Sequence, residues 1–536
     1  MCGIFAYLSN GKFTNFSKEY LKIMKDSAYK NKNRGPDNTI DLYVNNKIYM
    51  MFHRLSINDL SQNGNQPMVL NNCYLICNGE IFNHKEIINS YKFNTLTKSD
   101  CEVILHLYLY LKCNKSTNIF NDLCNILDGE FAFVLYDMDE DIAFIARDPF
   151  GVRPLFIGKT ENEDIVFSSE LKGLNRLCYE AEQFKPGHYM KVYHDNSLII
   201  DKYHSIMYLG LSSNNETILK NLNIYFRNAV YKRMMSDKEV CSLLSGGLDS
   251  SLVSSILADK MGPYQLKTFA IGIKGSPDLK NAQLVADHIK SNHYSIELTE
   301  EEFLNAIPEV IYSIESYDTT TVRASVGNYL VAKYIRENTD CKVVFNGDYA
   351  DEVCGGYKYF KKAPTELEFH EECNRLLNDI HYYDCLRSDR SISSNGLEAR
   401  VPFADKFFVD YYFSIPIKYR MSSDCLEKLI LRKAFENDNL LPNEVLFRPK
   451  EAFSDGVTSE TRSWHKIIQE HVNKIITDED FFLKKKNYIH NRPVLKESYY
   501  YRQIFDSYYE GFDNVIPYFW MPKWCKDVDD PSAREL

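Results

Sequence analysis

The sequence predicts two domains of different fold class: an α+β layered sandwich, followed by an α/β domain with a parallel sheet and helical C-terminal additions. The chain has 536 residues, more than one domain usually holds. Strand-like segments dominate its first two hundred residues, whereas strands and helices alternate from about residue 215. After about residue 360 the pattern is mostly helical. We therefore divide the chain into residues 2–210 and residues 211–536.

The first domain is expected to layer strands and helices. Its strand segments carry β-branched and aromatic residues with turn residues between them: 47–57, 73–81, 131–138, 142–148 and 164–170. Two segments, 18–29 and 100–112, have the apolar spacing of helices.

The second domain is expected to contain a parallel sheet. The polar stretch 211–220 is the predicted linker into it. Strands are expected at 239–244, 267–273, 293–298 and 342–348, with helices between them. Such alternation implies right-handed crossovers, and ligands then bind beyond the carboxyl ends of the strands. Two Gly-rich acidic loops, "SGGLDSS" and "NGDYADEVCGG", follow strands at that edge.

Composition narrows the classes of partner. The net charge of -11 argues against a nucleic-acid surface, which needs clustered Lys and Arg. We find neither a run of roughly 20 apolar residues nor a signal peptide at "MCGIFAYLSN". The 14 Cys form no C-x-x-C pair, which indicates reduced thiols. We expect a cytoplasmic protein with no membrane or nucleic-acid partner.

Cys2 is the first candidate for catalysis. Removal of Met1 would make it the N-terminal residue, and its α-amino group could then act as the base for its own thiol. The alternative is a small buried thiol in a first strand.

Possible partners of Cys2 follow in three segments. "CNGEIFN" offers the Asn78 amide, the Gly79 N–H and the Glu80 carboxylate, although "NGE" could equally be a turn. Arg54 could grip an α-carboxylate through two hydrogen bonds. Asp100 lies at the start of a predicted helix, where it could simply be an N-cap. Together these groups suit an amino acid with a side-chain amide.

The segments "MCGIFAYL", "NRGPD", "FHRLSI", "NGEIFNH", "SDCEVI" and "RDPFGVRPLF" resemble the glutaminase domain of class II glutamine amidotransferases. The resemblance implies an Ntn-hydrolase sandwich of αββα layers, with Cys2 as nucleophile and Asn78 and Gly79 as oxyanion hole. It also implies glutamine-binding residues: Arg54, Ile57, Asn58, Glu80 and Asp100. Asn33 stands where that family usually has His, while Arg34 is kept.

"SLLSGGLDSSLV" is a stronger local pattern. Its glycines let N–H groups surround an anion at a helix N-terminus. Ser245 and Ser250 could donate to phosphate, and Asp249 could reach Mg²⁺. The alternative is a strand-to-helix turn with an Asp or Ser cap.

This loop resembles the pyrophosphate loop of ATP pyrophosphatases, whose sheet is Rossmann-like. The resemblance implies Mg²⁺ held by Asp249 and Asp351. It also implies the ATP-binding residues Leu243, Ser245, Gly246, Gly247, Asp249, Ser250, Ile271, Asn346 and Gly347.

The two domains together resemble glutamine-hydrolysing asparagine synthetases, as do "GSPDL", "YDTTTVRAS", "GLEARVPF", "RPKEAFSDG", "YYYRQIF" and "DDPSAREL". The resemblance implies that ATP activates aspartate as an aspartyl-adenylate, and that channelled ammonia from glutamine displaces AMP. It places Arg323 and Lys450 on the aspartate and phosphate side. A homodimer is a further expectation.

One segment departs from the family, which has Ser-Gly-Glu-Gly-Ser-Asp-Glu where this chain has residues 346–352. Asp348 replaces the catalytic glutamate and is about one methylene shorter, and a shift of about 1 Å can cost on the order of a hundredfold in rate. Tyr349 and Ala350 replace Gly-Ser, so we expect a new backbone path, because Tyr rarely adopts φ > 0. Three hypotheses follow: an active asparagine synthetase, an amidotransferase that adenylates a related acid, or a binding protein with an impaired synthetase half.

Overall fold

The computed structural model describes all of the chain except residues 11–15, 194–196, 207, 209, 212, 422–425, 451–455, 460–461, 526–527 and 533–536. Parts of the predicted segments "RPKEAFSDG" and "DDPSAREL" lie outside the described residues. The chain divides into two compact units. Unit 1 comprises residues 1–205, 235–238 and 393–397, and unit 2 comprises residues 206–234, 239–392 and 398–536.

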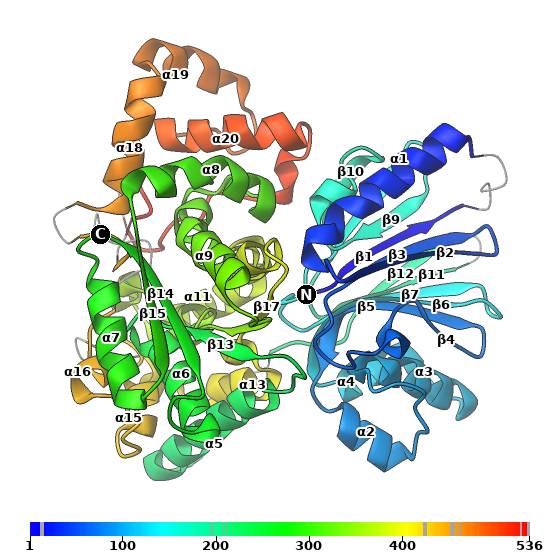
Figure 1. Ribbon diagram of the computed structural model, residues 1–536, viewed down its shortest axis with the longest axis horizontal. Coiled ribbons are helices and arrows are strands. Elements are labelled where there is room, and N and C mark those ends of the chain that lie inside the picture. The colour runs from blue at the N-terminus through cyan, green and yellow to red at the C-terminus, as the bar shows by residue number, and fades with distance from the viewer. Residues whose placement is uncertain are drawn as a thin grey trace. The chain divides into compact units, whose positions relative to one another are not determined.

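Unit 1 is built on two antiparallel six-stranded sheets (Figure 1). The first has the order β10-β8-β9-β1-β3-β2. Its strands are Gly3–Leu8 (β1), Asn38–Val44 (β2), Ile48–Arg54 (β3), Phe156–Thr160 (β8), Ile165–Ser168 (β9) and Cys178–Gln183 (β10). The second has the order β12-β11-β7-β6-β5-β4. Its strands are Met68–Leu70 (β4), Cys73–Ile81 (β5), Gly129–Asp137 (β6), Ile142–Arg147 (β7), His188–Val192 (β11) and Leu198–Lys202 (β12).

Side-chain alternation along β5 explains the layers of unit 1. Ile76 faces a core between the two sheets, with Ile4 of β1 and Met50 of β3. Leu75 faces the opposite way, into a second core that includes Leu107 of α3. The helices of the unit are Lys18–Tyr29 (α1), His84–Tyr91 (α2), Val103–Cys113 (α3) and Ile119–Ile126 (α4). The arrangement confirms the αββα sandwich.

Unit 2 is built on a parallel five-stranded sheet with the order β15-β14-β13-β16-β17. Its strands are Val240–Leu243 (β13), Lys267–Ile273 (β14), Asn292–Leu298 (β15), Val343–Phe345 (β16) and Glu398–Arg400 (β17). The strand order reverses between β13 and β16. This is the point at which α/β sheets of this kind bind ligands, and the Rossmann-like class is therefore confirmed.

Helices connect and follow these strands (Figure 1). The connecting helices are Asn215–Lys232 (α5), Leu248–Met261 (α6), Pro277–Ile289 (α7), Glu300–Ile314 (α8), Thr319–Asn338 (α9) and Ala350–Cys354 (α10). Later helices include Glu366–Asp379 (α11), Lys406–Ser414 (α13), Leu429–Phe435 (α15), Trp464–Ile475 (α18), Asp478–Lys484 (α19) and Lys496–Tyr509 (α20). Across the described ranges, no helix has both the length and the apolar character needed to cross a membrane.

The predicted linker 211–220 is partly wrong. Residues from Asn215 onward belong to α5, which begins after the N-cap Asn214. Most exposed residues of this helix are polar, Ile224 and Tyr225 excepted, but Ile218, Leu222 and Phe226 are spaced four residues apart and are fully buried. The polar face hid this apolar stripe in the sequence.

Candidate active sites in the two units

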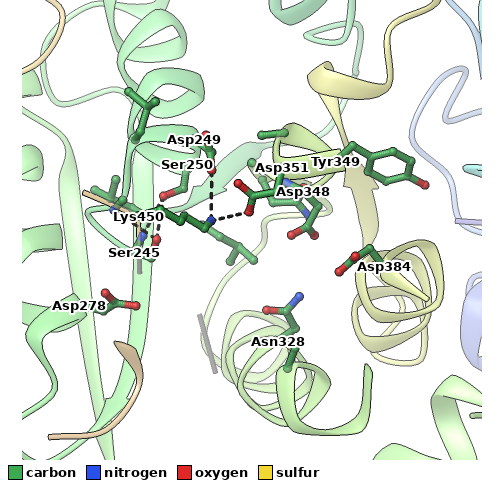
Figure 2. A pocket seen from close by; sticks show the side chains of 18 of the residues that line it. Ser245, Asp249, Ser250, Asp278, Asn328, Asp348, Tyr349, Asp351, Asp384 and Lys450 are labelled. Carbon is green, nitrogen blue, oxygen red and sulfur yellow. Dashed lines mark hydrogen bonds and ion pairs between the residues drawn. The ribbon is translucent and has the colours of Figure 1, made fainter. Parts of the chain in front are cut away.

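A cavity of about 180 Å³ lies in unit 2 where the strand order reverses. Loops after β13 and β16 line it, together with residues of β14, α9 and α15 (Figure 2). It contains most of the residues predicted for the synthetase site: Leu243, Ser245, Gly247, Asp249, Ser250, Ile271, Asn346, Gly347, Asp348, Asp351 and Lys450. Gly246 and Arg323 are not among its lining residues.

The loop after β13 is shaped by glycine. Gly246 has φ +72°, and a Cβ there would lie 2.4 Å from the carbonyl carbon of Asn281. The Ser245 N–H donates to the hydroxyl of Ser250 at 3.1 Å. Gly247 is the N-cap of α6 and provides no side-chain cap, so the first turn presents its N–H groups and positive dipole end beside the cavity. This arrangement is suited to an anion, as the sequence pattern predicted.

Asp249 and Asp351 share two ammonium groups. Lys428 Nζ lies 2.6 Å from an oxygen of each carboxylate, and Lys450 Nζ lies 2.5 Å from Asp351 and 3.4 Å from Asp249. Burial alone would raise the pKa of Asp351, but the two ammonium groups outweigh burial and hold this pKa below its ordinary value. Asp351 is therefore ionised at neutral pH.

The loop after β16 packs directly on the first loop. A Cβ at Gly347 would lie 2.5 Å from the backbone nitrogen of Ser250. The side-chain amide of Asn346 donates to the Ser388 hydroxyl at 2.8 Å. The side-chain oxygen Oδ1 of Asn346 accepts from the Asp348 N–H at 3.2 Å. The close approach of Gly347 to the first loop and the hydrogen bonds of the Asn346 side chain together fix the backbone position of Asp348.

We expected Tyr349 to avoid the left-handed region, but it does not. It adopts φ 75° and ψ −13° and is 1% exposed. A non-glycine residue in this region costs roughly 1–2 kcal/mol. The surrounding packing must offset that cost, and such strain is common at functional sites.

Asp348 lies at the cavity in an ion pair. Its Oδ1 is 2.7 Å from Arg387, whose Nε is 2.8 Å from Asp384. Burial raises the pKa of Asp348, although Arg387 opposes that shift. The other oxygen, Oδ2, is buried and has no hydrogen-bond partner among the described residues. Arg387 lies on a π-helical turn, Leu386–Arg390, a feature that often marks functional sites.

Arg323 is not among the residues that line the cavity. It is 4% exposed on α9 and forms ion pairs with Glu497 at 2.6 Å and Asp530 at 2.7 Å. Trp464 donates from its ring nitrogen to the Arg323 carbonyl at 3.1 Å. Arg323 therefore joins α9 to the C-terminal segments and does not face the cavity.

Several polar or charged cavity residues did not emerge from the sequence, among them the four named next. Lys428, Arg387, Asp384 and Asn328 all line the cavity but belong to no recognised motif. Lys428 follows Glu427 in "LEKLIL", where a lysine is usually a surface residue. Only its left-handed backbone, φ 55°, and its buried side chain distinguish it, and neither is visible in sequence.

In unit 1, Cys2 packs against the core between the sheets. Its Sγ lies 3.8 Å from the Leu55 carbonyl oxygen, and Arg34 donates from Nε to the Cys2 carbonyl at 2.9 Å. Asn78 shares the face of β5 with Ile76, which belongs to that same core. The amide nitrogen of Asn78 is buried and without a hydrogen-bond partner among the described residues, so a donor is available.

Three of the predicted glutamine-binding residues meet. The Asn58 amide donates to Glu80 and to Asp100 Oδ1, the latter at 3.4 Å. Asp100 is not an N-cap: its Oδ2 accepts from the Ile81 N–H at 2.6 Å, and Ser99 precedes the helical turn. The polar cluster joins β5 to the segment before α3.

Arg54 is engaged by its own loop. Its guanidinium donates to the carbonyls of Asp59 and Ser61, the latter at 2.6 Å, and to the Asn65 side chain at 2.9 Å. The Ile57 carbonyl accepts from the Asp237 N–H at 2.9 Å. Arg54 therefore shapes the loop that carries Asn58.

Both units match known families. Residues 1–210 match the family model "Glutamine amidotransferase domain", and residues 221–372 and 361–524 match "Asparagine synthase". The fold and sites thus define an amidotransferase joined to a synthetase. The chain is 42% identical to the glutamine-hydrolysing asparagine synthetases of Homo sapiens and Rattus norvegicus over 570 residues, and 41% identical to that of Gallus gallus over 575 residues. Each alignment covers 100% of this chain and 98% of the relative. The chain belongs to the family of glutamine-hydrolysing asparagine synthetases.

Proposed function

We propose that this chain synthesises asparagine from aspartate, ATP and glutamine, with glutamate, AMP and pyrophosphate as the other products. Unit 1 would hydrolyse glutamine, and unit 2 would form an aspartyl-adenylate that ammonia converts to asparagine. The observation that carries the proposal is the cavity at the sheet's reversal point. There, an anion-binding loop, a buried carboxylate at Asp348 and the Lys450 ammonium line one space.

In unit 1 we assign the nucleophile to the Cys2 thiol after removal of Met1. The thiolate would attack the side-chain amide of glutamine, and the buried Asn78 amide would donate to the developing oxyanion together with the Gly79 N–H. Asn58, Glu80 and Asp100 would bind the amino end of glutamine through the cluster they form. Arg54 and Ile57 would position the loop beside it.

In unit 2 the residues divide into three groups. Leu243 and Ile271 offer an apolar face for adenine at the strand ends. Ser245, Gly246, Gly247 and Ser250 would hold phosphates through hydroxyl and N–H groups. Lys450 would stabilise charge that develops on the phosphates while the aspartate carboxylate attacks and pyrophosphate leaves. Asn346 and Gly347 would support the nucleotide, and Asp348 would act on the acyl group.

The donor set also fits Mg²⁺. Asp249 and Asp351 supply carboxylate oxygens, the ligands this ion prefers, and Mg²⁺ commonly takes only one or two carboxylates plus phosphate oxygens and water. These two residues would hold it, and its chemistry there would be neutralisation of phosphate charge. Arg323 would act from a distance by fixing α9.

The activity test uses purified full-length chain with L-aspartate, Mg²⁺ and ATP, plus either glutamine or ammonium. Asparagine and pyrophosphate should form with both nitrogen donors, and glutamate should form with glutamine. Pyrophosphate without asparagine would favour a related acid or a failed transfer step. Glutamate without either product would favour a protein with an impaired synthetase half.

Cys2→Ala tests the assignment of unit 1. The variant should lose glutamine-dependent synthesis, by roughly a hundredfold or more, because the proposed thioester forms on the Cys2 thiol. Ammonium-dependent synthesis should be retained. Cys113→Ala, at an exposed cysteine of the same unit, is the matched control and should behave as wild type. Retained glutamine-dependent synthesis in Cys2→Ala would refute the assignment.

Two further expectations accompany this function. We propose a homodimer, to be tested by light scattering as a mass of about twice the 62.5 kDa of one chain. We also propose a cytoplasmic location, which the absence of disulfides among the described cysteines supports.

A further inference from the structure

The charged residues of the cavity in unit 2 are divided unevenly between its two ends. At the phosphate end, Asp249 and Asp351 are balanced by the ammonium groups of Lys428 and Lys450. Arg432 and Arg448 also line the cavity. The cations at this end balance its carboxylates, so the negative charge of a nucleotide can bind there without net repulsion.

The other end holds more carboxylates than cations. Asp348, Glu352 and Asp384 all line it, and Tyr357 donates from its hydroxyl to both Glu352 and Asp384. Among the described residues, Arg387 is the one cation in ion pairs with this group, through Asp348 and Asp384. Buried carboxylates in excess are costly unless a cation meets them, so this end is suited to a positively charged ligand group.

A metal ion is the less suitable cation here. Asp348 and Asp384 are already ion-paired with Arg387, whereas Mg²⁺ demands a near-octahedral set of oxygen ligands. An ammonium group needs only scattered hydrogen-bond acceptors around three N–H donors, which carboxylates and an amide oxygen can supply.

Asn328 provides an independent indication of a ligand. It lies on α9, is 4% exposed and lines the cavity. Its side-chain amide forms no hydrogen bond with the described residues and opens onto the cavity. Figure 2 shows it pointing from the helix into the cavity, on the side of Asp348 and Asp384. The residue is almost completely buried but its amide is unpaired and faces the cavity, so a ligand bound there can be its partner.

We propose that Asn328, Asp384 and Glu352 form the subsite for the α-ammonium group of the amino-acid substrate. The proposal rests on the function proposed above and names the part of aspartate that this end of the cavity recognises. Asn328 is then a specificity-determining residue. It distinguishes aspartate from succinate, which has the same two carboxylates but no ammonium group. The aspartate carboxylate that reacts would point back toward Lys450 and the phosphates.

The test measures binding of L-aspartate and of succinate by calorimetry, in the full chain with Mg²⁺ and a non-hydrolysable ATP analogue. Asn328→Leu keeps the size of the side chain and breaks no hydrogen bond of the described residues, so folding should be retained. Asp384→Asn keeps shape and removes charge. Each should weaken aspartate binding by roughly tenfold to a hundredfold, because a hydrogen bond to a charged group is lost. Succinate binding should change by less than about twofold.

Asn338→Leu is the matched control, because Asn338 is exposed at the far end of the same helix. It should bind both ligands as wild type does. Unchanged aspartate binding in Asn328→Leu and Asp384→Asn would overturn the proposal. So would an equal loss for aspartate and succinate, which would indicate a general distortion of the site.

Failure of the inference and failure of the function give different results. Asparagine synthesis by the wild type, with aspartate binding insensitive to Asn328, refutes the ammonium subsite and leaves the function standing. If the wild type makes no asparagine but binds an amino acid through Asn328, the function is wrong and the subsite stands. Equal affinity of the wild type for succinate and aspartate contradicts the subsite directly.

Discussion

Two loops meet at the cavity of unit 2 and use the same backbone conformation with different residues. The loop after β13 has Gly246 at φ +72°, and the loop after β16 has Tyr349 at φ 75°. At Gly246 both the conformation and the lack of space for a Cβ require glycine. At Tyr349 a large side chain occupies the left-handed position and is almost completely buried.

The difference matches what each loop holds. The first loop presents N–H groups and hydroxyls to an anion, which is possible because small residues leave the backbone accessible. The second loop presents carboxylates. Because these groups are partly desolvated, the loop must hold them in fixed positions beside their partners. The buried Tyr349 side chain holds the backbone of this loop in place, while its own backbone remains in a strained conformation. A positive φ can therefore serve two purposes. A glycine there lets a ligand approach the backbone, whereas a bulky buried residue there anchors the loop.

Asp348→Ala should have the largest effect, since it removes the carboxylate that the second loop exists to hold. We expect pyrophosphate release to fall by roughly a hundredfold or more, because a positioned catalytic group is lost. Glutaminase activity, measured as glutamate release, should remain. If asparagine synthesis survived in Asp348→Ala, the working carboxylate would have to be another residue and the contrast between the loops would lose its basis.

Gly246→Ala should be the next largest. The new Cβ would meet backbone atoms of Asn281 and Ala282 at 2.4 and 2.5 Å and would sit at a positive φ. Overpacking and strain together should lower the free energy of unfolding by about 3 kcal/mol. Thermal unfolding measures this.

Gly247→Ala is the matched control for stability, because its Cβ would meet only the Ser245 hydroxyl at 3.5 Å and its φ is −79°. It should unfold close to the wild-type temperature. Equal losses in Gly246→Ala and Gly247→Ala would show that conformation does not distinguish the two glycines.

Tyr349 gives the smallest and most diagnostic effect. Both Tyr349→Gly and Tyr349→Ala lose the same buried ring, so their difference reports the backbone alone. The Gly variant should be more stable than the Ala variant by about 1 kcal/mol, because only Ala retains the left-handed strain. Chemical denaturation of the two variants measures the difference.

At the next position the order should reverse. Ala350 begins helix α10, so Ala350→Gly should lose about 0.5–1 kcal/mol relative to wild type. If Tyr349→Ala proved more stable than Tyr349→Gly, the loop would not hold a positive φ in solution.

Much of the fold was predictable because its periods are local. The strand expected at 267–273 is observed as β14 with the same bounds, and the helix expected at 18–29 is α1. The expected linker failed because α5 buries only a narrow stripe that includes Ile218 and Leu222. The order of the strands in each sheet could not be derived from such local patterns.

The sites divide in a similar way. Residues in contiguous motifs, such as Ser245 and Asp249, line one cavity. Lys428 and Asn328 reach it from distant segments, and nothing near them in sequence indicates that they are buried. Arg323 was predicted from a matching segment, but its side chain follows two carboxylates, Glu497 and Asp530, whose proximity only the folded chain reveals.

The pairing of Arg323 with Asp530 has a consequence for the stability of α9. The cavity-lining helix α9 carries a buried guanidinium that is shared between Glu497 and a residue near the C-terminus. A polypeptide truncated before Asp530 would retain every motif of both catalytic centres, yet would leave part of that charge unmatched, an error that commonly costs several kcal/mol. The pairing with Asp530 therefore contributes to the stability of the helix that lines the cavity, although Asp530 itself lies outside the cavity.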